Sequence, residues 1–315
     1  MKAQRILVVS SANVDFVQRM RRVPFSGETI VEESLDYSYM PGGKGANSAI
    51  AFARFGADTV FSCKLGKDSN AKRLYEIYKS EGIDTRFITE TPDAPTGLAS
   101  ILIEENGKNR IIVYPGANAL LSADDVETAF NCYPDAVYLQ FEIPDEAVFE
   151  AAERANSAGI PLFIDAGPAR MDFPLSELGK VEIFSPNEIE TRVFTGISPT
   201  SEENCLRAAM RLASSVDARY IVLKLGERGS FIYDGYEYYI IPAENVAPED
   251  TTGAGDVFTA VMTYVYLRNG DIVSAVKYAT CAAALSITKP GVYASIPTRA
   301  ETLAYVKEKI AASKQ

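Results

Sequence analysis

Short apolar runs alternate with amphipathic segments along most of the chain. Six runs have the length and composition of buried strands, and six segments repeat apolar residues at the helical period. This alternation is typical of βαβ units, so we expect a mainly parallel sheet with helices on both faces. The predicted strands are Arg5–Ser10, Thr59–Leu65, Ala136–Gln140, Pro161–Asp165, Val181–Ser185 and Tyr220–Leu225, and the predicted helices are Gly45–Phe55, Ser69–Ser80, Asp145–Ser157, Ser201–Ser215, Gly253–Arg268 and Asp271–Ile287.

Two stretches, Val14–Met40 and Thr96–Tyr114, break this alternation with β-favouring sequence that has no helical period. The second contains an Asn106-Gly107 pair, which is typical of a hairpin turn. We expect residues 14–40 and 96–114 to form a small β layer, and residues 1–13, 41–95 and 115–315 to form the α/β core. Such a layer is placed to act as a lid that excludes water from a substrate. A further hairpin is predicted at Tyr233–Tyr236, within the main sheet.

The composition is that of a folded protein with one large core, since 47% of the 315 residues are hydrophobic and 23% are charged. No apolar run is long enough to cross a membrane, and the short run Ile6–Val9 is not followed by a signal-peptide cleavage site. The net charge of −11 argues against a nucleic-acid binder, because phosphate neutralisation needs clustered Lys and Arg. We expect a cytoplasmic protein without a membrane or nucleic-acid partner.

The chain has four scattered cysteines and no histidine. Cys63, Cys132, Cys205 and Cys281 lack the spacing of a metal site or a disulfide framework, so we interpret them as reduced thiols in or near the core. The absence of histidine excludes Ser-His-Asp and Cys-His nucleophilic sites, and every metal site with a histidine ligand. Proton transfer must therefore use a carboxylate, Lys, Tyr or Cys.

The segment Asp250–Asp256 (Asp-Thr-Thr-Gly-Ala-Gly-Asp) comes immediately before a helical apolar stripe, and therefore lies at a helix N-terminus. The free N–H groups there bind anions, and Gly253 and Gly255 let a phosphate approach the backbone. Asp256 falls in the first turn, where it can accept the proton of a hydroxyl group that attacks a phosphoryl group. Alternatively, the glycines form a tight turn and Asp256 only complements the helix dipole, which an isolated Gly-x-Gly would favour.

A second glycine-rich segment, Pro41–Asn47 (Pro-Gly-Gly-Lys-Gly-Ala-Asn), precedes the predicted helix that ends at Phe55. Asn13 and Asp15 follow the first strand, and ligands of open α/β sheets bind at the carboxyl ends of strands. Amides and a carboxylate suit sugar hydroxyl groups, each of which donates and accepts hydrogen bonds. Asn13 and Asp15 fit equally well as turn residues that bond to the local backbone.

Together these two segments resemble the two signatures of the ribokinase-like (PfkB) carbohydrate kinases, and the similarity covers essentially the whole chain. Further similar segments follow in the family's order: Gly116–Ala119, Gln140–Glu142, Pro186–Glu188 and Leu225–Gly229. The resemblance implies a three-layer α/β/α sandwich with a central, mainly parallel sheet and a small β lid. It also implies ATP-dependent phosphorylation of a sugar with Asp256 as the general base, and the second signature reduces the weight of the helix-dipole alternative.

On the sugar side, Asn13 and Asp15 resemble the family's Asn-x-Asp pair, in which the Asp15 position binds vicinal hydroxyl groups. Glu142 is similar to a carboxylate that reaches the same pocket, although a residue between a strand and Pro144 can also be an ordinary surface residue. The sugar contacts that the resemblance implies are Asn13, Asp15, Gly43, Lys44, Asn47, Glu142 and Asp256.

On the nucleotide side, Asn187–Glu190 (Asn-Glu-Ile-Glu) resembles the family's Asn-x-x-Glu, in which the Glu190 position organises Mg²⁺ and phosphates through water. This outer-sphere role suits an ion that dehydrates reluctantly. The same residues fit a helix start in which Asn187 and Glu190 form a capping box, and the two interpretations are compatible. The nucleotide-binding residues that the resemblance implies are Asn187, Lys224, Gly226, Glu227, Gly253, Ala254 and Gly255.

The family also uses a monovalent cation, usually K⁺, near the anion site. By resemblance its ligands are Asp250, Thr252, Ser286, Gly291 and Ser295, some of them through backbone carbonyl groups. The sequence departs from many family members at Gly253, where they have alanine, and at Thr280, where some have a histidine near adenine. Neither departure touches the implied chemistry.

The implied reaction transfers the γ-phosphoryl group of ATP to the C5 hydroxyl of D-ribose. Deoxyribose, a ketose, a sugar acid or a nucleoside are alternative substrates within the same family. A non-catalytic sugar-binding regulator would not need Asp256. A dinucleotide-binding oxidoreductase would have Gly-x-Gly-x-x-Gly where the chain has Ser10–Asn13.

The resemblance also implies a homodimer that forms through the lid strands. The apolar and aromatic side chains available for such an interface are Val31, Leu35, Tyr37, Tyr39, Ile101 and Ile103. The same side chains could instead face the chain's own pocket.

Overall fold

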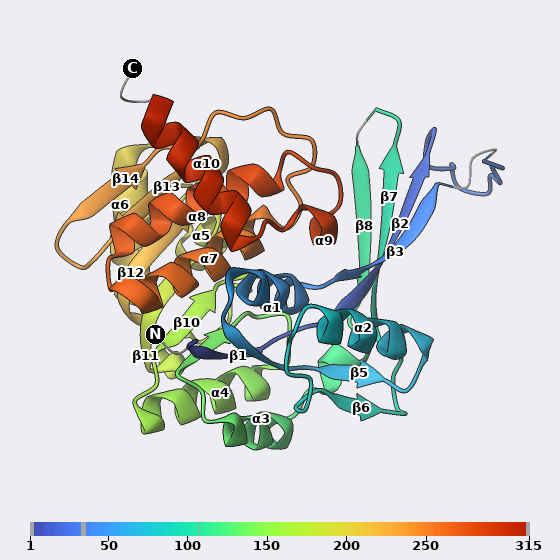
Figure 1. Cartoon of the computed structure of the whole chain (residues 1–315), viewed down its shortest axis with the longest axis horizontal. Helices are drawn as coiled ribbons and strands as arrows, with labels where there is room; N and C mark the ends of the chain where they lie inside the picture. Colours follow the sequence, from blue (N-terminus) through green and yellow to red (C-terminus); the bar gives the residue numbers. More distant parts are fainter. Residues whose placement is uncertain (1–2, 33–35, 107, 313–315) are drawn as a thin grey trace.

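An eight-stranded sheet forms the centre of the computed structural model, which describes residues 3–32, 36–106 and 108–312 (Figure 1). The six strands from β12 to β4 are parallel, and β13 and β14 extend the sheet as antiparallel strands. In spatial order the strands are β14 (Tyr238–Ile241), β13 (Ser230–Tyr233), β12 (Asp217–Lys224), β11 (Lys180–Ser185), β10 (Leu162–Asp165), β9 (Ala136–Leu139), β1 (Arg5–Val9) and β4 (Asp58–Ser62).

Helices cover both faces of this sheet, and each face has its own hydrophobic core. On one face lie α1 (Lys44–Phe55), α2 (Ser69–Ser80), α7 (Ala254–Asn269) and α8 (Ile272–Ser286), with α10 (Arg299–Ala312) packed on α8. On the other face lie α3 (Ala123–Ala129), α4 (Asp145–Ala158), α5 (Glu188–Thr195) and α6 (Glu202–Ala213). The predicted α/β/α sandwich with a mainly parallel sheet is therefore confirmed.

The six predicted helices are all present within two residues of their expected bounds, but one predicted strand is two. Instead of a single strand over Thr59–Leu65, β4 ends at Ser62, and β5 (Lys64–Gly66) pairs with β6 (Thr89–Thr91) in a separate small sheet. The chain turns away at the edge of the main sheet, and apolar periodicity does not record a change of pairing partner. The short helices α3, α5 and α9 (Val292–Ser295) and the weakly patterned α10 were not among the predicted helices.

A second sheet of four strands projects from the core at the right of Figure 1. Its order is β3 (Tyr37–Gly42), β2 (Asn13–Met20), β7 (Gly97–Glu104) and β8 (Asn109–Tyr114). β2 pairs with β3 in antiparallel and with β7 in parallel orientation, so both β-favouring stretches contribute to one sheet. Gly107 of the predicted turn between β7 and β8 lies outside the described residues, as does Leu35.

The inner end of this sheet reaches the core, because Asn13 pairs with both Gly42 and Gly97. β2 begins at Asn13, one residue before the expected start of the β layer at residue 14, and β3 ends at Gly42, two residues after its expected end at residue 40. All four cysteines are buried free thiols. No helix in the described part of the chain is both long and apolar enough to span a membrane.

Phe52 offers a test of the core beneath α1. Its side chain is fully buried and meets the Tyr138 ring edge to face at 5.1 Å between ring centroids. We expect Phe52→Ala to lower the free energy of unfolding by about 3–5 kcal/mol, because a large cavity would form. Chemical denaturation measures this value, and Phe25→Ala is the control, since Phe25 is 74% exposed and its loss should change stability by less than about 0.5 kcal/mol. A small effect at Phe52 would contradict the packing described here.

Candidate active site

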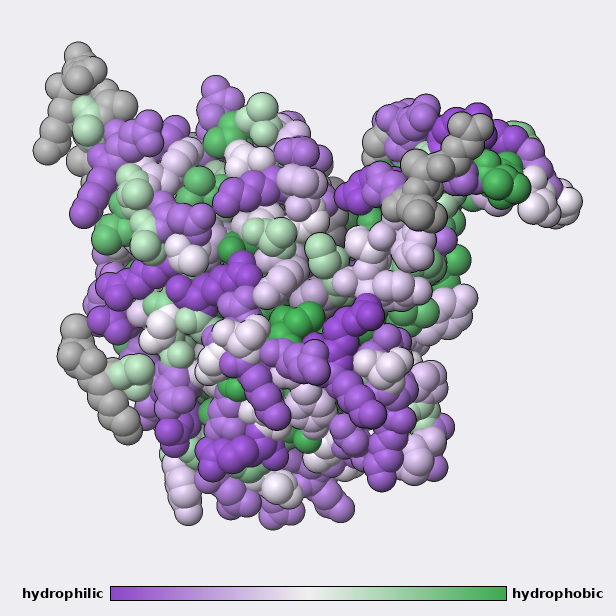
Figure 2. Space-filling model, turned by 45° about the vertical axis from the view of Figure 1, so that its right-hand side comes forward, coloured by the Kyte–Doolittle hydropathy of each residue, from purple (hydrophilic) through white to green (hydrophobic). Residues whose placement is uncertain are grey.

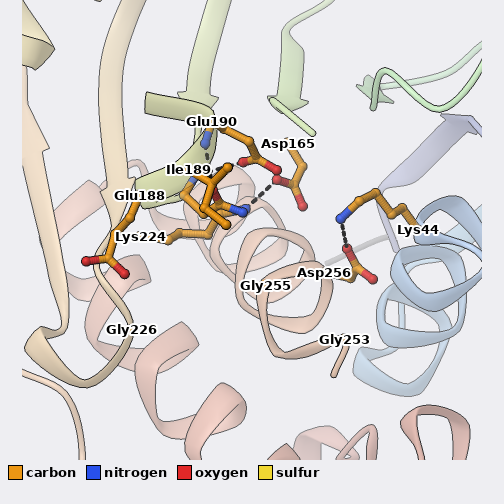
Figure 3. A pocket seen from close by; sticks show the side chains of 11 residues that line it. Lys44, Asp165, Glu188, Ile189, Glu190, Lys224, Gly226, Gly253, Gly255 and Asp256 are labelled. Carbon is orange, nitrogen blue, oxygen red and sulfur yellow. Dashed lines mark hydrogen bonds and ion pairs between the residues drawn. The ribbon is translucent and has the colours of Figure 1, made fainter. Parts of the chain in front are cut away.

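The polar residues of interest gather at the carboxyl ends of the parallel strands, where the first turns of α1 and α7 meet the sheet (Figure 3). They surround a cavity of about 340 Å³. Strand order explains the position, because β1, β9, β10, β11 and β12 are consecutive in space and parallel, so all end at one edge. The cavity is lined by Lys44, Asp165, Asn187, Glu188, Ile189, Glu190, Lys224, Gly226, Gly253, Gly255 and Asp256.

The start of α7 forms one wall of this cavity. Gly253 precedes the helix with φ of 75°, a left-handed conformation that favours glycine, and no side chain caps the helix. The first N–H groups of a helix have no partner within it, so this uncapped end presents donors and a positive dipole to the cavity. Gly253 also has no room for a side chain, because a Cβ atom there would lie 2.4 Å from Cγ1 of Val292 in α9. The geometry suits an anion, as predicted.

Asp256 lies in the first turn of α7 with only 4% of its surface exposed. Its Oδ2 accepts a hydrogen bond from Nδ2 of Asn47 at 2.8 Å, and its Oδ1 lies 3.6 Å from Nζ of Lys44. Burial raises the pKa of Asp256 above its ordinary value, against the opposing effect of the Lys44 charge. Asp256 in turn holds the pKa of Lys44 well above its usual range. The two glycine-rich segments of the sequence are therefore in direct contact through these three side chains.

Asp15 and Asn13 occupy spaces that glycine residues leave free. A Cβ atom at Gly42 would lie 2.0 Å from Oδ1 of Asp15, and a Cβ atom at Gly97 would lie 2.1 Å from Oδ1 of Asn13. Burial raises the pKa of Asp15 to about 7, and the charges of Glu142 and Asp256 add to the shift. Glu142 and Asp256, which raise the pKa of Asp15, are thus the two carboxylates that the family resemblance places in the same pocket.

Asn118 is a residue of this region that the sequence analysis did not single out. It lies in the short 3-10 helix Gly116–Leu120 and is buried. Its Nδ2 donates to Oδ1 of Asn13 at 2.7 Å, and its Oδ1 accepts from the backbone N–H of Ala12 at 2.8 Å. Asn118 therefore fixes the chain between β1 and β2. The segment Gly116–Ala119 resembles the family, but the sequence pattern does not reveal that Asn118 bonds to Asn13.

Glu142 and Asn47 complete the sugar side of the predicted site. Glu142 accepts hydrogen bonds from the Ser11 hydroxyl and, at 3.3 Å, from the backbone N–H of Lys44, so it joins the end of β1 to the start of α1. Gly43, which precedes α1, has φ of 89° and lies against the backbone of Asn13. Oδ1 of Asn47 is buried and has no hydrogen-bond partner among the described residues. Such an orphaned acceptor suits a ligand hydroxyl group.

Asn187 and Glu190 form the capping box that the sequence allowed. The backbone N–H of Asn187 donates to Oε2 of Glu190 at 2.7 Å, and the backbone N–H of Glu190 donates to Oδ1 of Asn187 at 2.8 Å. Glu190 is 5% exposed, and burial raises its pKa. Its carboxylate still lines the cavity, so the capping role and a role toward a ligand are structurally compatible.

The remaining predicted nucleotide residues divide into two groups. Lys224, Gly226 and Gly255 line the cavity, and Ala254 is the first residue of α7. Glu227 is exposed on the 3-10 turn Gly226–Arg228 and is not among the lining residues. Lys224 forms an ion pair with Asp165, the last residue of β10, which the sequence analysis did not identify. The sequence signal that could have identified Asp165 is an acidic residue at the end of a predicted buried strand.

The segments predicted to hold a monovalent cation are adjacent. Oδ2 of Asp250 accepts from the backbone N–H of Gly291 at 3.1 Å, and Oδ1 accepts from the backbone N–H of Thr252 at 2.9 Å. The carbonyl oxygen of Ile287, directly after Ser286, accepts the N–H groups of residues 249 and 250. Ser295 is the last residue of α9, which begins next to Gly291. Within the described residues, no group of three or more Cys, Asp and Glu side chains could hold a metal.

The chain is similar to known proteins over nearly its whole length. Residues 3–299 match the family described as pfkB family carbohydrate kinase. The chain is 34% identical over 97% of its length to a bifunctional ribokinase/ribose-5-phosphate isomerase A of Fructilactobacillus sanfranciscensis, of which it spans 56%. It is 32% identical to a deoxyribokinase of Salmonella typhi, over 93% of this chain and 95% of that protein.

A solved structure of Arabidopsis thaliana ribokinase complexed with ribose and ATP superposes with a TM-score of 0.88 at 31% identity, covering 97% of this chain and 99% of that one. The match with the family extends over the strands and helices that form the cavity, and over both glycine-rich segments. The chain belongs to the pfkB family of carbohydrate kinases.

Proposed function

We propose that this protein transfers the γ-phosphoryl group of ATP to the C5 hydroxyl group of D-ribose. The observation that carries the proposal is the position of Asp256. It lies in the first turn of α7, beside an uncapped helix N-terminus that suits phosphate, and it bonds to Asn47 of the glycine-rich segment on the sugar side. A carboxylate at this junction can accept the proton of a hydroxyl group as that group attacks phosphorus.

The chain's own groups divide the work of this reaction. Asp256 holds the proton that leaves the sugar hydroxyl, and its raised pKa keeps it basic enough for that task. The N–H groups at the start of α7 face the phosphoryl group and stabilise charge that develops on it. Lys44, whose Nζ is 3.6 Å from Asp256, adds a positive charge at the same point. We assign the orientation of the sugar hydroxyl groups to Asp15, Asn13, Gly43 and Glu142, which lie at the inner end of β2 and around the start of α1.

Magnesium fits the nucleotide side as an ion held largely through water. Glu190 offers one buried carboxylate at the cavity, and no cage of three or more acidic side chains exists among the described residues. Mg²⁺ keeps several waters and takes one or two carboxylates together with substrate phosphates, so a single glutamate is consistent with it. Bound there, Mg²⁺ would neutralise charge on the ATP phosphates. Glu190 would orient its water shell.

Potassium fits the region where Asp250 contacts the residues between α8 and α9. Hydrogen bonds connect Asp250 to Thr252, to Gly291 and to Ile287, the residue after Ser286, so the segments that carry the expected oxygen ligands are adjacent. The described residues contain no cluster of three or more acidic side chains that could hold a metal. Oxygen ligands with little net charge suit a monovalent cation. A cation bound there would strengthen the positive field at the start of α7, because Gly253 lies directly against Val292, the first residue of α9.

We further propose that the projecting sheet acts as a lid and as a dimer interface. Exposed apolar and aromatic side chains lie along β3 and β8: Tyr37, Tyr39, Ile111, Ile112, Val113 and Tyr114. Figure 2 shows green, apolar side chains on the projecting sheet. Among the residues expected at this interface, Val31 is exposed, whereas Ile101 is buried within its own chain. A second copy of the sheet would cover the exposed set.

Substitution of the base gives the first test. We expect Asp256→Asn to lower kcat by roughly 10²–10⁴-fold while the affinity for the sugar, measured by calorimetry, changes little. Asparagine keeps the shape and can still bond to Asn47, but it cannot take the proton. Asp271→Asn is a matched control, since Asp271 caps α8 outside the cavity and asparagine caps a helix equally well. Near-normal turnover by Asp256→Asn would contradict the mechanism.

Sugar affinity should depend on pH through Asp15. Its pKa of about 7 means that the carboxyl group is protonated at pH 6 and ionised at pH 8. An ionised carboxylate accepts two hydroxyl hydrogen bonds, so we expect the Kd for the sugar to fall as pH rises through 7. Calorimetric titrations at several pH values measure this, with Asp15→Asn as the comparison. An equal pH dependence in that variant would exclude Asp15 as its source.

The substrate is tested by measuring ATP consumption with pentoses, hexoses, sugar acids and nucleosides, each with and without K⁺. We expect D-ribose to give the highest kcat/KM, and K⁺ to raise it. 2-Deoxyribose lacks one of the vicinal hydroxyl groups expected at Asp15, so its kcat/KM should be about 10- to 100-fold lower. A preference for 2-deoxyribose would instead assign the activity named for the Salmonella relative. No turnover with any of these acceptors would reject the proposed function.

A further inference from the structure

Asp165 is a buried carboxylate that the reaction described above does not use. It ends β10 with 1% of its surface exposed, at the carboxyl edge of the sheet and on the wall of the cavity. A carboxylate in such a place is stable only when a positive group or hydrogen bonds compensate it. Its Oδ1 pairs with Nζ of Lys224, and its Oδ2 has a long contact of 3.5 Å with Nε2 of Gln140. The ion pair with Lys224 is therefore its main compensation.

Lys224 reaches this carboxylate from a strand that is not its neighbour. It ends β12, which is separated from β10 by β11. Strands two positions apart lie roughly 10 Å from each other, so the lysine side chain must bend back across the end of β11. Only 11% of this side chain is exposed, although a lysine at a strand end beside a cavity is free to extend into it. The pairing with Asp165 determines its direction.

The ammonium group is thereby held over the first turn of α7. Nζ of Lys224 donates to Oγ1 of Thr259 at 3.3 Å, and that hydroxyl group donates to the carbonyl of Gly255 at 3.0 Å. A Cβ atom at Gly255 would lie 3.6 Å from Nζ. A positive side chain is repelled by the positive end of a helix dipole, so this position requires a fixed negative partner. Asp165 is that partner.

The hydrogen-bond count leaves one donor for a ligand. An ammonium group has three N–H groups, and within the described residues Asp165 and Thr259 take two of them. Lys224 lines the cavity beside Gly255, where the helix N–H groups also point. Figure 3 shows the two lysine–aspartate pairs, Lys44 with Asp256 and Lys224 with Asp165, around the same helix start. An anion placed there meets both ammonium groups.

We propose that Asp165 is a positioning residue, which holds the Lys224 ammonium over the start of α7 so that its remaining N–H group binds the transferred phosphoryl group. This inference rests on the proposed function. Asp165 acts through Lys224, because its carboxylate is paired with the Lys224 ammonium group. Without the carboxylate the lysine side chain regains its freedom, and the positive charge leaves the point where negative charge develops.

A set of three variants tests the proposal by steady-state kinetics with ATP and the best sugar. Lys224→Met should lower kcat by roughly 10²–10³-fold, as the loss of one donor to a developing anion does. Asp165→Asn should lower kcat by about 10- to 100-fold, as the loss of a residue that orients a ligand does, with little change in KM for the sugar. The double variant should match Lys224→Met within about twofold, because Asp165 has no effect once Lys224 is absent.

The pH profile separates this role from a merely structural one. Asp256 faces the charges of Lys44, Asp165 and Lys224, and it also faces Asp15 from β2. Asp165 raises the pKa of Asp256 and Lys224 lowers it. The acid limb of kcat/KM should therefore move to higher pH in Lys224→Met. In Asp165→Asn the loss of the carboxylate and the departure of the Lys224 charge have opposite effects on the pKa of Asp256, so the limb should move little. A clear shift to lower pH in Asp165→Asn would mean that Lys224 keeps its place without Asp165, and would contradict the proposal.

Controls keep the outcome decisive. Asp125→Asn removes a comparable ion pair outside the cavity, in which Nζ of Lys64 in β5 lies 2.5 Å from Oδ2 of Asp125 in α3. The two side chains are 16% and 13% exposed. This substitution should lower the melting temperature without changing kcat. If Asp165→Asn does not fold, the double variant, which buries no unpaired charge, is compared with Lys224→Met alone.

Two results would overturn the proposal if the wild-type enzyme is active. One is an unchanged kcat in Asp165→Asn, and the other is a loss of kcat in the double variant that equals the product of the two single losses. Absence of sugar phosphorylation by the wild-type protein would instead reject the proposed function.

Discussion

A carboxylate buried at the start of a helix imposes the main constraint on this structure. Asp256 is almost entirely enclosed, and an uncompensated charge in such a place would be expelled or neutralised. Asn47 and Lys44 compensate it, and both come from the first turn of α1. The starts of α1 and α7 must therefore lie side by side. Two segments that are separated by about two hundred residues thus form one site. The α7 segment supplies the buried carboxylate, and the α1 segment supplies the hydrogen bond and the positive charge that compensate it.

The parallel sheet provides the remaining positions. A buried polar network beneath the cavity links neighbouring strand ends, since Ser10 donates to Gln140, whose amide approaches both Ser48 of α1 and Asp165. Because these polar groups are buried, they must form hydrogen bonds with one another. The network therefore fixes how the ends of β1, β9 and β10 are aligned. The projecting sheet continues directly from this region, because Asn13 is both the first residue of β2 and a partner of Asn118. The residues expected to contact the sugar are therefore directly connected to the projecting sheet.

Local signals made much of this predictable. The periodicity gave the central strands and the long helices, and the two glycine-rich segments marked the two helix starts that form the site. What local patterns lack is information on pairing partners. Lys224 and Asp165 end different strands, and nothing in either neighbourhood shows that a lysine bends across β11 to reach an aspartate. The split of Thr59–Leu65 at Cys63 and the bond between Asn118 and Asn13 have the same origin, because both depend on contacts between distant segments.

The contact between Gly253 and Val292 has a consequence for how such chains diverge. The isopropyl group of Val292 fills the volume that a Cβ atom would need at Gly253, so the two positions share a single small space. A chain with alanine at position 253 would need a smaller side chain at position 292, or a shift of α9 together with Gly291 and Ser295 at its two ends. Variation at these two sites should therefore be correlated. The size of the side chain at position 292 would set how closely α9 approaches the start of α7.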